Sequence, residues 1–336
     1  MIIEIDPDPN AGLGPATIVR GDALNLPLAD ASVDLVVTSP PYFALRSYRD
    51  GGEHIDGQIG DEPTPEAYLD ALIAATREMV RVLKPTGSIW VNLGDKYAGK
   101  SLIGLPWQYA LRAVRELGLI LRAEVIWAKP NGLPESVTDR VRRSHETWFH
   151  FVTQPRYFAA VDEIREPHVW GREINPAWRE TRRQRIEAIE GRETKGGRMA
   201  TMHPLGRLPG SVRTVATTPL RVPEWLGVDH FAAFPPAWPA WVIRGWCPKG
   251  GVVLDPFGGT GTTALAARAL GRHGITVDLS ADYCRLAQWR VTDPDQLAKV
   301  TGRRPRRKRD HDNHDDVIDG QVSLFDLLAD GEELAS

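Results

Sequence analysis

Short apolar runs alternate with amphipathic stretches along most of the chain, which predicts strands joined by helices. Strands are expected at residues 17–20, 33–37, 88–95, 121–127, 147–152, 252–254 and 274–277. Helices are expected at residues 65–83, 106–117, 238–246, 264–270 and 281–291. Strands that alternate with helices favour an α/β fold built on a mostly parallel sheet.

Composition narrows the class of protein without changing this fold. A chain of 336 residues, 42% hydrophobic and 25% charged, has room for one large α/β domain with an insertion, or for two domains. Cys247 and Cys284 lack metal or redox spacing, so no metal site is predicted and a reducing cytoplasm is expected. No apolar run reaches membrane-spanning length, and the first residues do not resemble a signal peptide. With a net charge of −3, any surface that binds nucleic acid must be local.

Three stretches depart from the α/β pattern. Residues 1–16 are rich in Asp, Pro and Gly and are expected to form a loose leader. Residues 165–225 lose periodicity, apart from a charged helix expected at 179–192, and contain twelve Lys and Arg against seven Asp and Glu. Residues 296–336 are predicted to be a disordered tail, because a basic block at 303–309 precedes an acidic block.

The first candidate for chemistry follows the apolar run at residues 33–37. The sequence Ser39-Pro40-Pro41-Tyr42 ends the strand there, because proline has no N–H for a central ladder. Open α/β sheets bind ligands at the carboxyl ends of their strands. A hydroxyl, a carbonyl and an aromatic ring at this position suit a planar group with an exocyclic amine. Taken alone, the motif is equally compatible with a proline-rich turn.

The second candidate is a glycine-rich loop far down the chain. A buried strand reaches Asp255-Pro256-Phe257 and then Gly258-Gly259-Thr260-Gly261-Thr262, before an Ala-rich helix. Glycines let the backbone approach a ligand closely, and the amides at a helix start are hydrogen-bond donors. The spacing differs from the G-x-G-x-x-G of nicotinamide enzymes. The strand at 274–277 then ends in Asp278, an acid placed to bind ribose hydroxyls.

Together, T-S-P-P-Y and D-P-F-G-G-T-G-T-T resemble the motifs of the amino-methylating DNA methyltransferases, which act on cytosine N4 or adenine N6. Because the catalytic motif comes first, residues 15–290 resemble the circularly permuted β group of that family. The resemblance implies a Rossmann-like methyltransferase fold and S-adenosylmethionine as the cofactor. It also divides the chain into a catalytic half (17–164), an inserted target-recognition region (165–225) and a cofactor-binding half (226–295).

The resemblance implies roles for single residues. The catalytic set is Ser39, Pro40, Pro41 and Tyr42. The cofactor-binding set is Asp22, Phe234, Asp255, Phe257, Gly258, Gly259, Thr260, Gly261, Thr262 and Asp278. Within it, Asp22 matches an acid that binds the adenine amine, with a helix N-cap as the equal alternative. Phe234 matches a wall of the cofactor pocket, with core packing as the alternative. Asn92 and Asp95, at the end of the strand 88–95, are expected either to shape the pocket or to serve as caps and turns.

Double-stranded DNA is the implied substrate, with its target base flipped out of the helix. Arg and Lys neutralise phosphates, and Arg reads guanine, so basic residues of the insertion and of nearby loops are the candidate DNA contacts. They are Arg46, Lys129, Arg182, Arg183, Lys195, Arg198, Arg207 and Arg213. The alternatives are a solvated charged insertion and, for Lys129, an uninvolved surface position.

The target base is predicted from Ser39. In the family, T-S-P-P-Y is typical of enzymes that methylate cytosine N4, whereas D-P-P-Y and N-P-P-Y are typical of adenine N6 enzymes. Cytosine N4 is therefore predicted, with adenine N6 as the alternative. No cysteine lies near Ser39 to form the thiolate adduct that C5-cytosine chemistry needs. An inactive DNA-binding relative and a nicotinamide oxidoreductase are further alternatives, disfavoured by the intact Ser39 and Tyr42 and by the glycine spacing.

The tail suggests a partner besides DNA. Residues Gln321-Val322-Ser323-Leu324-Phe325 resemble the pentapeptide by which many bacterial DNA enzymes dock on the replication sliding clamp. A tail helix that folds back on the body is the alternative. A cognate restriction endonuclease is the other partner considered, and no membrane partner is expected.

Overall fold

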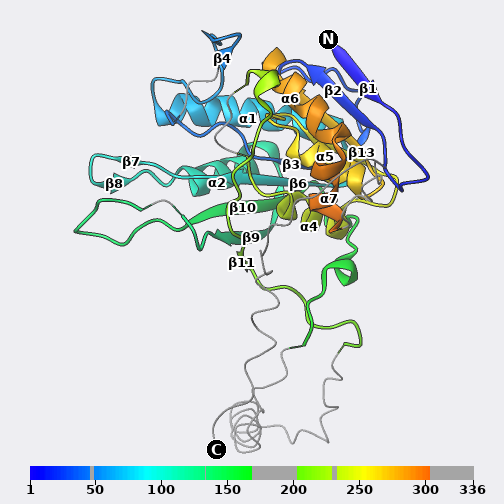
Figure 1. Ribbon diagram of the computed structural model, residues 1–336. Coiled ribbons are helices and arrows are strands. Elements are labelled where there is room, and N and C mark those ends of the chain that lie inside the picture. The colour runs from blue at the N-terminus through cyan, green and yellow to red at the C-terminus, as the bar shows by residue number, and fades with distance from the viewer. Residues whose placement is uncertain (46–48, 133, 169–202, 229–232, 303–336) are drawn as a thin grey trace, which may run out of the picture. The chain divides into compact units, whose positions relative to one another are not determined.

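The part of the chain that the structure describes contains one mixed sheet of nine strands. The computed structural model describes residues 1–45, 49–132, 134–168, 203–228 and 233–302, all within the unit Met1–Arg304. The strands are β1 (Ile2–Ile5), β2 (Ala16–Arg20), β3 (Val33–Thr38), β6 (Leu83–Leu93), β9 (Ile120–Ala128), β10 (His145–Val152), β11 (Val212–Thr214), β12 (Val252–Asp255) and β13 (His273–Asp278). They lie in the order β1-β2-β13-β12-β3-β6-β10-β9-β11 (Figure 1). Two hairpins stand apart, β4 (Arg49–Asp50) with β5 (Glu53–His54) and β7 (Tyr97–Ala98) with β8 (Ser101–Leu102).

Strand direction gathers the candidate residues at one edge of the sheet. β2, β13, β12, β3 and β6 are parallel neighbours, so their carboxyl ends share that edge. β10 is antiparallel to both β6 and β9. Its first residues, His145 and Glu146, therefore lie at the same edge as the carboxyl ends of these parallel strands.

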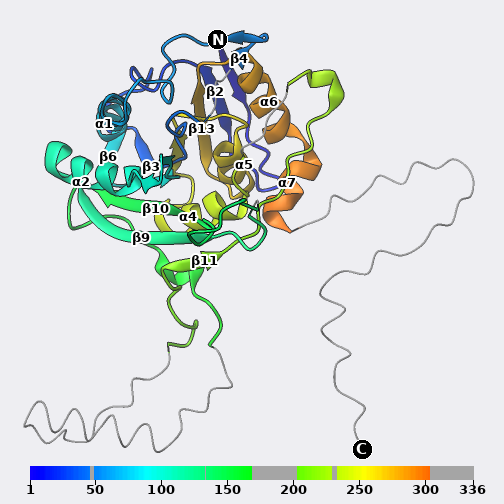
Figure 2. The same ribbon diagram turned by 90° about the vertical axis from the view of Figure 1, so that its left-hand side faces the viewer.

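Helices cover both faces of the sheet, as Figure 2 shows for α1 and α2 on one side and α5, α6 and α7 on the other. The helices are α1 (Pro65–Val82), α2 (Leu105–Leu117), α4 (Ala237–Trp246), α5 (Thr262–Ala269), α6 (Ala281–Thr292) and α7 (Pro294–Thr301), with short 3-10 helices η1 (Val161–Ile164) and η2 (Glu224–Leu226). Successive strand residues face opposite layers. Val36 packs with α1 and α2, whereas Leu35 and Val37 pack with the tryptophans of α4.

The α/β fold and the order of its elements are confirmed. Every strand expected from residue 17 to 152 and from 252 to 277 is present, as is every helix expected outside the insertion. The largest displacement is at the start of β6, which begins directly after α1 at Leu83. Leu83 pairs with Val33 and Ser88 pairs with Leu35, so the residues between them form an irregularity in the ladder. Residues 84–87, between the predicted helix at 65–83 and the predicted strand at 88–95, therefore lie inside β6.

The loose leader at residues 1–16 was a wrong expectation. β1 runs antiparallel to β2, with Ile3 opposite Ile18 and Ile5 opposite Ala16. Ile3 and Ile5 pack against the apolar cluster of α5 and α6. The Arg268 guanidinium also donates to the carbonyls of Asp6 (2.7 Å) and Gly14 (2.5 Å). Exposed and half-buried residues alternate along Ile2–Ile5, as expected for an edge strand with one face on the core.

Two boundaries also differ from the prediction. The insertion at 165–225 contributes β11, which pairs in parallel with β9 and extends the sheet. The expected helix at 179–192 lies outside the described residues. At the other end, α7 occupies the start of the predicted tail, because Asp293 caps it and Leu297 packs against the body.

Candidate active site

Two loops that are distant in the sequence meet at the carboxyl edge. β3 and β12 are parallel neighbours, with Leu35 opposite Val253 and Val36 opposite Leu254. The loops that follow them line one cavity of about 1210 Å³. Of the predicted residues, the cavity is lined by Asp22, Ser39, Pro40, Pro41, Tyr42, Lys129, Phe234, Phe257, Gly258, Gly259, Thr260, Thr262 and Asp278. Its size exceeds the range of about 300–1000 Å³ for a drug-sized ligand, which leaves room for two molecules side by side.

The glycine loop is held against β13 by backbone hydrogen bonds. The Gly258 amide donates to the Val277 carbonyl (2.8 Å), and the Gly259 amide donates to Asp278 Oδ2 (2.7 Å). Asp278 Oδ1 accepts from the Ser280 amide (2.9 Å). Burial raises the pKa of Asp278 to about 6. A Cβ on Gly258 would lie 1.6 Å from Thr276 Oγ1, so the close approach of loop and strand requires glycine.

Arg290 of α6 braces the threonines of the same loop. Arg290 is only 2% exposed, and its guanidinium donates to the hydroxyls of Thr260 and Thr262. Sequence reasoning missed this arginine, because nothing near it in the chain marks it as part of the site.

Gly261 lies away from the cavity surface: its backbone has φ +71°, and a Cβ there would be 2.7 Å from Ala287 Cβ. Its role is to let α5 start against α6.

Asp255 lies beneath the cavity rather than on it, which differs from the predicted cofactor contact. Its carboxylate accepts from Thr38 Oγ1 (2.6 Å), from Thr263 Oγ1 (2.9 Å) and from the Phe257 amide (3.2 Å). Burial raises the pKa of Asp255 to about 7. Because Thr38 directly precedes Ser39 and Thr263 belongs to α5, this carboxyl ties the two loops together from below.

Asp22 and Phe234 both line the cavity. Asp22 Oδ1 accepts from the Leu24 amide (2.9 Å) within a turn, and no helix follows, so the alternative of a helix N-cap is wrong. The side chain of Asp22 remains exposed. Phe234 meets Trp148 edge-on, with ring centroids 5.8 Å apart, while another part of the residue faces the cavity. Phe234 therefore serves the core and the cavity at once.

A buried polar network supports the Ser39–Tyr42 turn. The Tyr42 hydroxyl donates to Glu146 Oε2 (2.9 Å) and accepts from Asn92 Nδ2 (2.8 Å). Asn92 Nδ2 also donates to Glu146 Oε2 (2.8 Å). Ser39 Oγ lies 3.3 Å from Tyr42 Oη. Burial, and then the charge of Glu146, raise the pKa of Tyr42 well above its usual range, so this phenol stays protonated.

Glu146 is the residue of this network that sequence reasoning missed. It sits on β10 at the start of an apolar strand, and its other oxygen, Oε1, pairs with the Lys129 ammonium. Lys129 also lies over the Trp127 ring, 4.2 Å from its centroid. Both side chains of the ion pair are less than one-fifth exposed. The one available signal was an acid directly before the predicted strand at 147–152.

Packing fixes the rest of the turn. The Pro41 carbonyl accepts from the Tyr68 hydroxyl of α1 (2.8 Å), whereas no described residue donates to the Pro40 carbonyl. The Tyr42 ring lies against Gly94, where a Cβ would be 2.6 Å from Tyr42 Cε2. Asp95, the next residue, accepts from the amides of Gly104 and Leu105 (3.1 Å each) and also lines the cavity, so it caps α2 and shapes the pocket.

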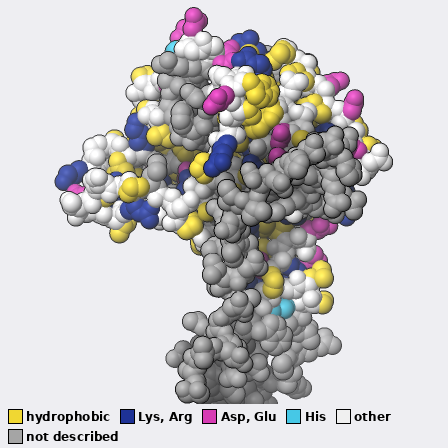
Figure 3. Space-filling model, viewed as in Figure 1, with side chains coloured by type: hydrophobic (Ala, Val, Ile, Leu, Met, Phe, Trp, Pro, Cys, Tyr) yellow, Lys and Arg dark blue, Asp and Glu magenta, His cyan; other side chains and the backbone are white. Residues whose placement is uncertain are grey.

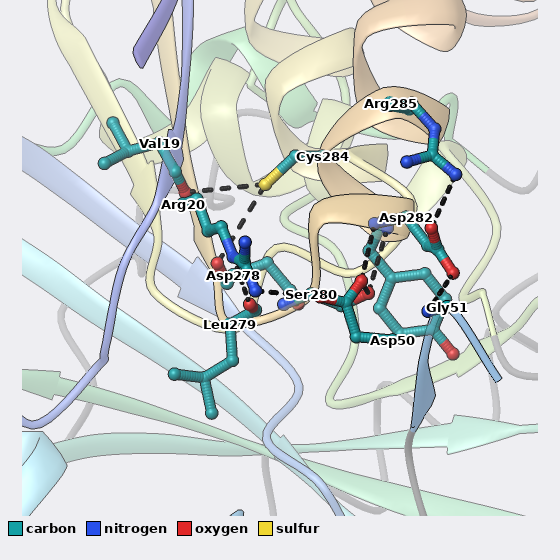
Figure 4. Close-up of polar contacts among 11 residues, drawn as sticks. Val19, Arg20, Asp50, Gly51, Asp278, Leu279, Ser280, Asp282, Cys284 and Arg285 are labelled. Carbon is teal, nitrogen blue, oxygen red and sulfur yellow. Dashed lines mark hydrogen bonds and ion pairs between the residues drawn. The ribbon is translucent and has the colours of Figure 1, made fainter. Parts of the chain in front are cut away.

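A strap formed by the β4–β5 hairpin joins the loop after Tyr42 to the cofactor half (Figure 4). Asp50 Oδ2 pairs with the Arg20 guanidinium at 2.8 Å, and Asp50 Oδ1 accepts from the Ser280 hydroxyl (3.2 Å) and the Asp282 amide (3.1 Å). The Gly51 amide donates to Asp282 Oδ2 (2.8 Å). The hairpin is therefore fastened beside Asp278, while residues on either side of it line the cavity.

The predicted DNA contacts are found in several environments. Arg207 is exposed and pairs with Glu166 (2.9 Å). Arg213 is half-buried, 4.3 Å from the centroid of the Trp241 ring, and burial lowers its pKa. Arg213 is thus packed inside the protein, which does not fit the predicted role of a free phosphate contact. Lys129 is paired with Glu146 on the cavity lining, and its contact with DNA stays a prediction. Arg46, Arg182, Arg183, Lys195 and Arg198 lie outside the described residues.

The described residues contain neither a candidate metal site nor a membrane-spanning helix. Among them, no group of three or more His, Cys, Asp or Glu side chains could hold a metal ion. No helix within the described ranges is long and apolar enough to cross a membrane.

Known proteins are similar to this chain in sequence and in fold. Residues 33–289 match the family model for N6/N4 methyltransferases, described as DNA methylase. The chain belongs to this family. It is 32% identical over 307 residues to the Type II methyltransferase M.XycI of Xanthomonas campestris pv. cyanopsidis, covering 82% of this chain and 87% of that one. It is 31% identical over 287 residues to the Type II methyltransferase M.SmaI of Serratia marcescens, covering 77% and 84%.

A solved structure agrees with this assignment at the level of the fold. The PvuII DNA methyltransferase (cytosine-N4-specific) superposes with a TM-score of 0.61 at 20% identity, over 85% of this chain and 90% of that one. The predicted family and the permuted, Rossmann-like methyltransferase fold are confirmed. The protein is a DNA methyltransferase, and S-adenosylmethionine is its cofactor, as predicted.

Proposed function

We propose that this DNA methyltransferase is site-specific and transfers the methyl group to N4 of a flipped cytosine. The observation that carries the proposal is Ser39: its neutral hydroxyl lies 3.3 Å from Tyr42 Oη, in a cavity that the glycine loop also lines. In the β group, T-S-P-P-Y is typical of N4-cytosine enzymes. A base inside a duplex cannot present its amine to an enclosed site, so the target must leave the stack.

The catalytic residues act mainly by positioning. Ser39 Oγ and the Pro40 carbonyl accept the two hydrogens of the exocyclic amine, and the Tyr42 ring stacks on the base. The tie between the Pro41 carbonyl and Tyr68 holds the turn rigid, which leaves the Pro40 carbonyl directed at the base. When bound, S-adenosylmethionine supplies an activated methyl group. Orientation of the amine in a preformed site lowers the barrier without a covalent intermediate.

The residues around the glycine loop suit the cofactor. The loop backbone approaches it closely because Gly258 and Gly259 carry no side chain, and Thr260 and Thr262 are held by Arg290. Asp278 binds the ribose hydroxyls, and the exposed carboxylate of Asp22 accepts from the adenine amine. Phe257 and Phe234 supply apolar walls. A carboxylate for ribose and backbone amides near a helix start are the donor set that such a nucleoside requires.

DNA is expected to approach the edge of the sheet where the cavity opens. Figure 3 shows Lys and Arg side chains over the projection formed by the β7–β8 hairpin and the connection from β9 to β10. They include Lys100, 93% exposed, and the exposed Arg142. Together with Arg207 and the predicted cations of 165–225, these residues would neutralise phosphates.

The test is to express the protein in a bacterium free of DNA methylation and to analyse the nucleosides of its genomic DNA by mass spectrometry. N4-methylcytosine in wild-type cells, and its absence in cells with Ser39→Ala, is the expected result. N6-methyladenine would overturn the base assignment and leave the family intact. DNA with neither modified base would favour an inactive binder.

Adenine N6 is the second candidate function, since the family contains both kinds of enzyme. Docking of residues 321–325 on the sliding clamp, and a cognate restriction endonuclease, stay predictions. So does a cytoplasmic location.

A further inference from the structure

The proposed reaction raises the question of where the amine's proton goes. Methyl transfer leaves the exocyclic nitrogen with a positive charge until one of its hydrogens departs. A carboxylate at position 39 could keep that proton. Ser39 is a neutral hydroxyl and can take a proton only if it passes its own proton on. An onward acceptor is therefore required.

Hydrogen bonds provide a continuous path away from Ser39. Tyr42 Oη donates to Glu146 Oε2 (2.9 Å), so its two lone pairs are free to accept. One accepts from Asn92 Nδ2 (2.8 Å), and the other faces Ser39 Oγ at 3.3 Å. With Ser39 donating to Tyr42 and Tyr42 donating to Glu146, every link points in one direction.

The surroundings suit a relay that ends at Glu146. Asn92 is 1% exposed and donates to both Tyr42 and Glu146, which fixes their spacing. The Tyr42 phenol stays protonated at neutral pH, so it can conduct a proton without storing one. Glu146 is held on its far side by the Lys129 ammonium. Both members of this pair line the cavity, which gives the acquired proton a route to solvent.

We propose that Glu146 is the terminal proton acceptor of the methyl transfer, reached through Ser39 and Tyr42. As the N–CH₃ bond forms and the S–CH₃ bond breaks with its electron pair on sulfur, one N–H proton moves to Ser39 Oγ. The Ser39 hydroxyl proton moves to Tyr42 Oη, and the Tyr42 proton moves to Glu146 Oε2. Ser39 and Tyr42 end neutral, and Glu146 ends as a carboxylic acid that later releases its proton to water.

The proposal rests on an exocyclic amine bound at Ser39, and two substitutions test it. Glu146→Gln keeps the size and an acceptor for Tyr42 but cannot gain a proton. Tyr42→Phe keeps the ring for stacking but cuts the path. Loss of a general base typically costs 10²- to 10⁴-fold, so we expect each to lower the single-turnover rate by about 100-fold or more. Because both interrupt one path, the double variant should be no slower than either single variant.

Binding measurements separate this role from a structural one. The Kd for S-adenosylmethionine, by calorimetry, and base flipping, by 2-aminopurine fluorescence at the mapped site, should stay within about twofold of wild type in both variants. Glu146→Asp, which restores a carboxylate, should recover part of the rate. The control Glu124→Gln, on neighbouring β9 and outside the cavity lining, should match wild type.

The outcomes distinguish this proposal from the proposed function. If wild-type protein modifies DNA and Glu146→Gln or Tyr42→Phe keeps a rate within about threefold, the relay is wrong and the function stands. Loss of cofactor binding or flipping together with the rate would also refute the relay and assign the network to the fold. Unmodified DNA with wild-type protein would refute the function itself.

Discussion

The cofactor end and the base end of the cavity are held in place by different kinds of contact. At the cofactor end, backbone amides fix the glycine loop: the amides of Gly258 and Gly259 bond to β13 and its terminal acid, and Arg290 braces the threonines beside them. At the base end, the contacts are made by side chains. Tyr42 lies in the turn after β3 and Asn92 lies on β6. Glu146 lies on β10, and Lys129 directly follows β9. One end depends on the absence of side chains, and the other depends on their exact atoms.

The difference predicts how each end tolerates substitution. A backbone site fails when a Cβ is added, because packed strands and loops cannot move apart cheaply. A side-chain network fails when one polar atom is lost, because its buried partners are left unsatisfied. Substitutions at the cofactor end should therefore weaken the binding of S-adenosylmethionine. Substitutions at the base end should lower the rate of methyl transfer.

The largest effect is expected from Gly258→Ala. The added Cβ would overlap Thr276 Oγ1 at 1.6 Å and approach its Cβ at 2.9 Å, so the loop must shift. We expect S-adenosylmethionine affinity to fall by about 100-fold or more, measured by calorimetry, while 2-aminopurine flipping stays unchanged. Gly210→Ala is the matched control, because its Cβ meets nothing within 4 Å. Equal affinities of the two variants would contradict the backbone account.

The same contrast explains what the sequence could predict. The cofactor loop is local: strand, glycines and helix follow one another in 252–263, and glycine marks close backbone approach. The S-P-P-Y turn is local for the same reason. Glu146 and Arg290 are not local. They join the site because β10 runs antiparallel beside β6 and because α6 packs on α5. Those placements depend on the three-dimensional fold.

Misjudged segments have a similar cause. Arg213 looked like a DNA contact because the insertion is basic, but β11 adds it to the sheet edge against Trp241. Residues 1–16 looked loose because their Pro and Gly outweighed the four residues Ile2–Ile5, which become ordered only by pairing with β2. A short edge strand has little intrinsic stability, so its existence depends on its neighbour.

A second, smaller effect tests Asp255, the buried carboxyl that bonds to Thr38 before the Ser39 turn and to Thr263 of α5. Burial raises the pKa of Asp255 to about 7, so the folded protein binds this proton more tightly than the unfolded chain. Its contribution therefore makes the free energy of unfolding decrease as pH rises from about 4 to 7. Asp255→Asn removes that contribution. Between pH 5 and 7, wild type should lose on the order of 2 kcal/mol more than the variant, measured by urea unfolding.

Asp278 titrates in both proteins, so most of its contribution cancels in this comparison; its charge is the last and smallest of the causes that act on Asp255. Identical pH slopes for wild type and Asp255→Asn would mean that the buried carboxyl does not change its protonation on folding. A steeper slope in the variant would reverse the sign and contradict the burial argument.

The smallest effect is expected at the strap, where the contacts are partly exposed. Asp50 is 22% exposed and its partner Arg20 is 50% exposed, so solvent weakens their attraction. Asp50→Ala should speed S-adenosylmethionine dissociation by about three- to tenfold in stopped-flow chase experiments. Asp56→Ala, at a fully exposed position of the same loop, is the control. The single-turnover rate decides what the strap does: an unchanged rate means that it retains only the cofactor. A lower rate would mean that the strap also orders the turn at Tyr42 and that the two ends do not act independently.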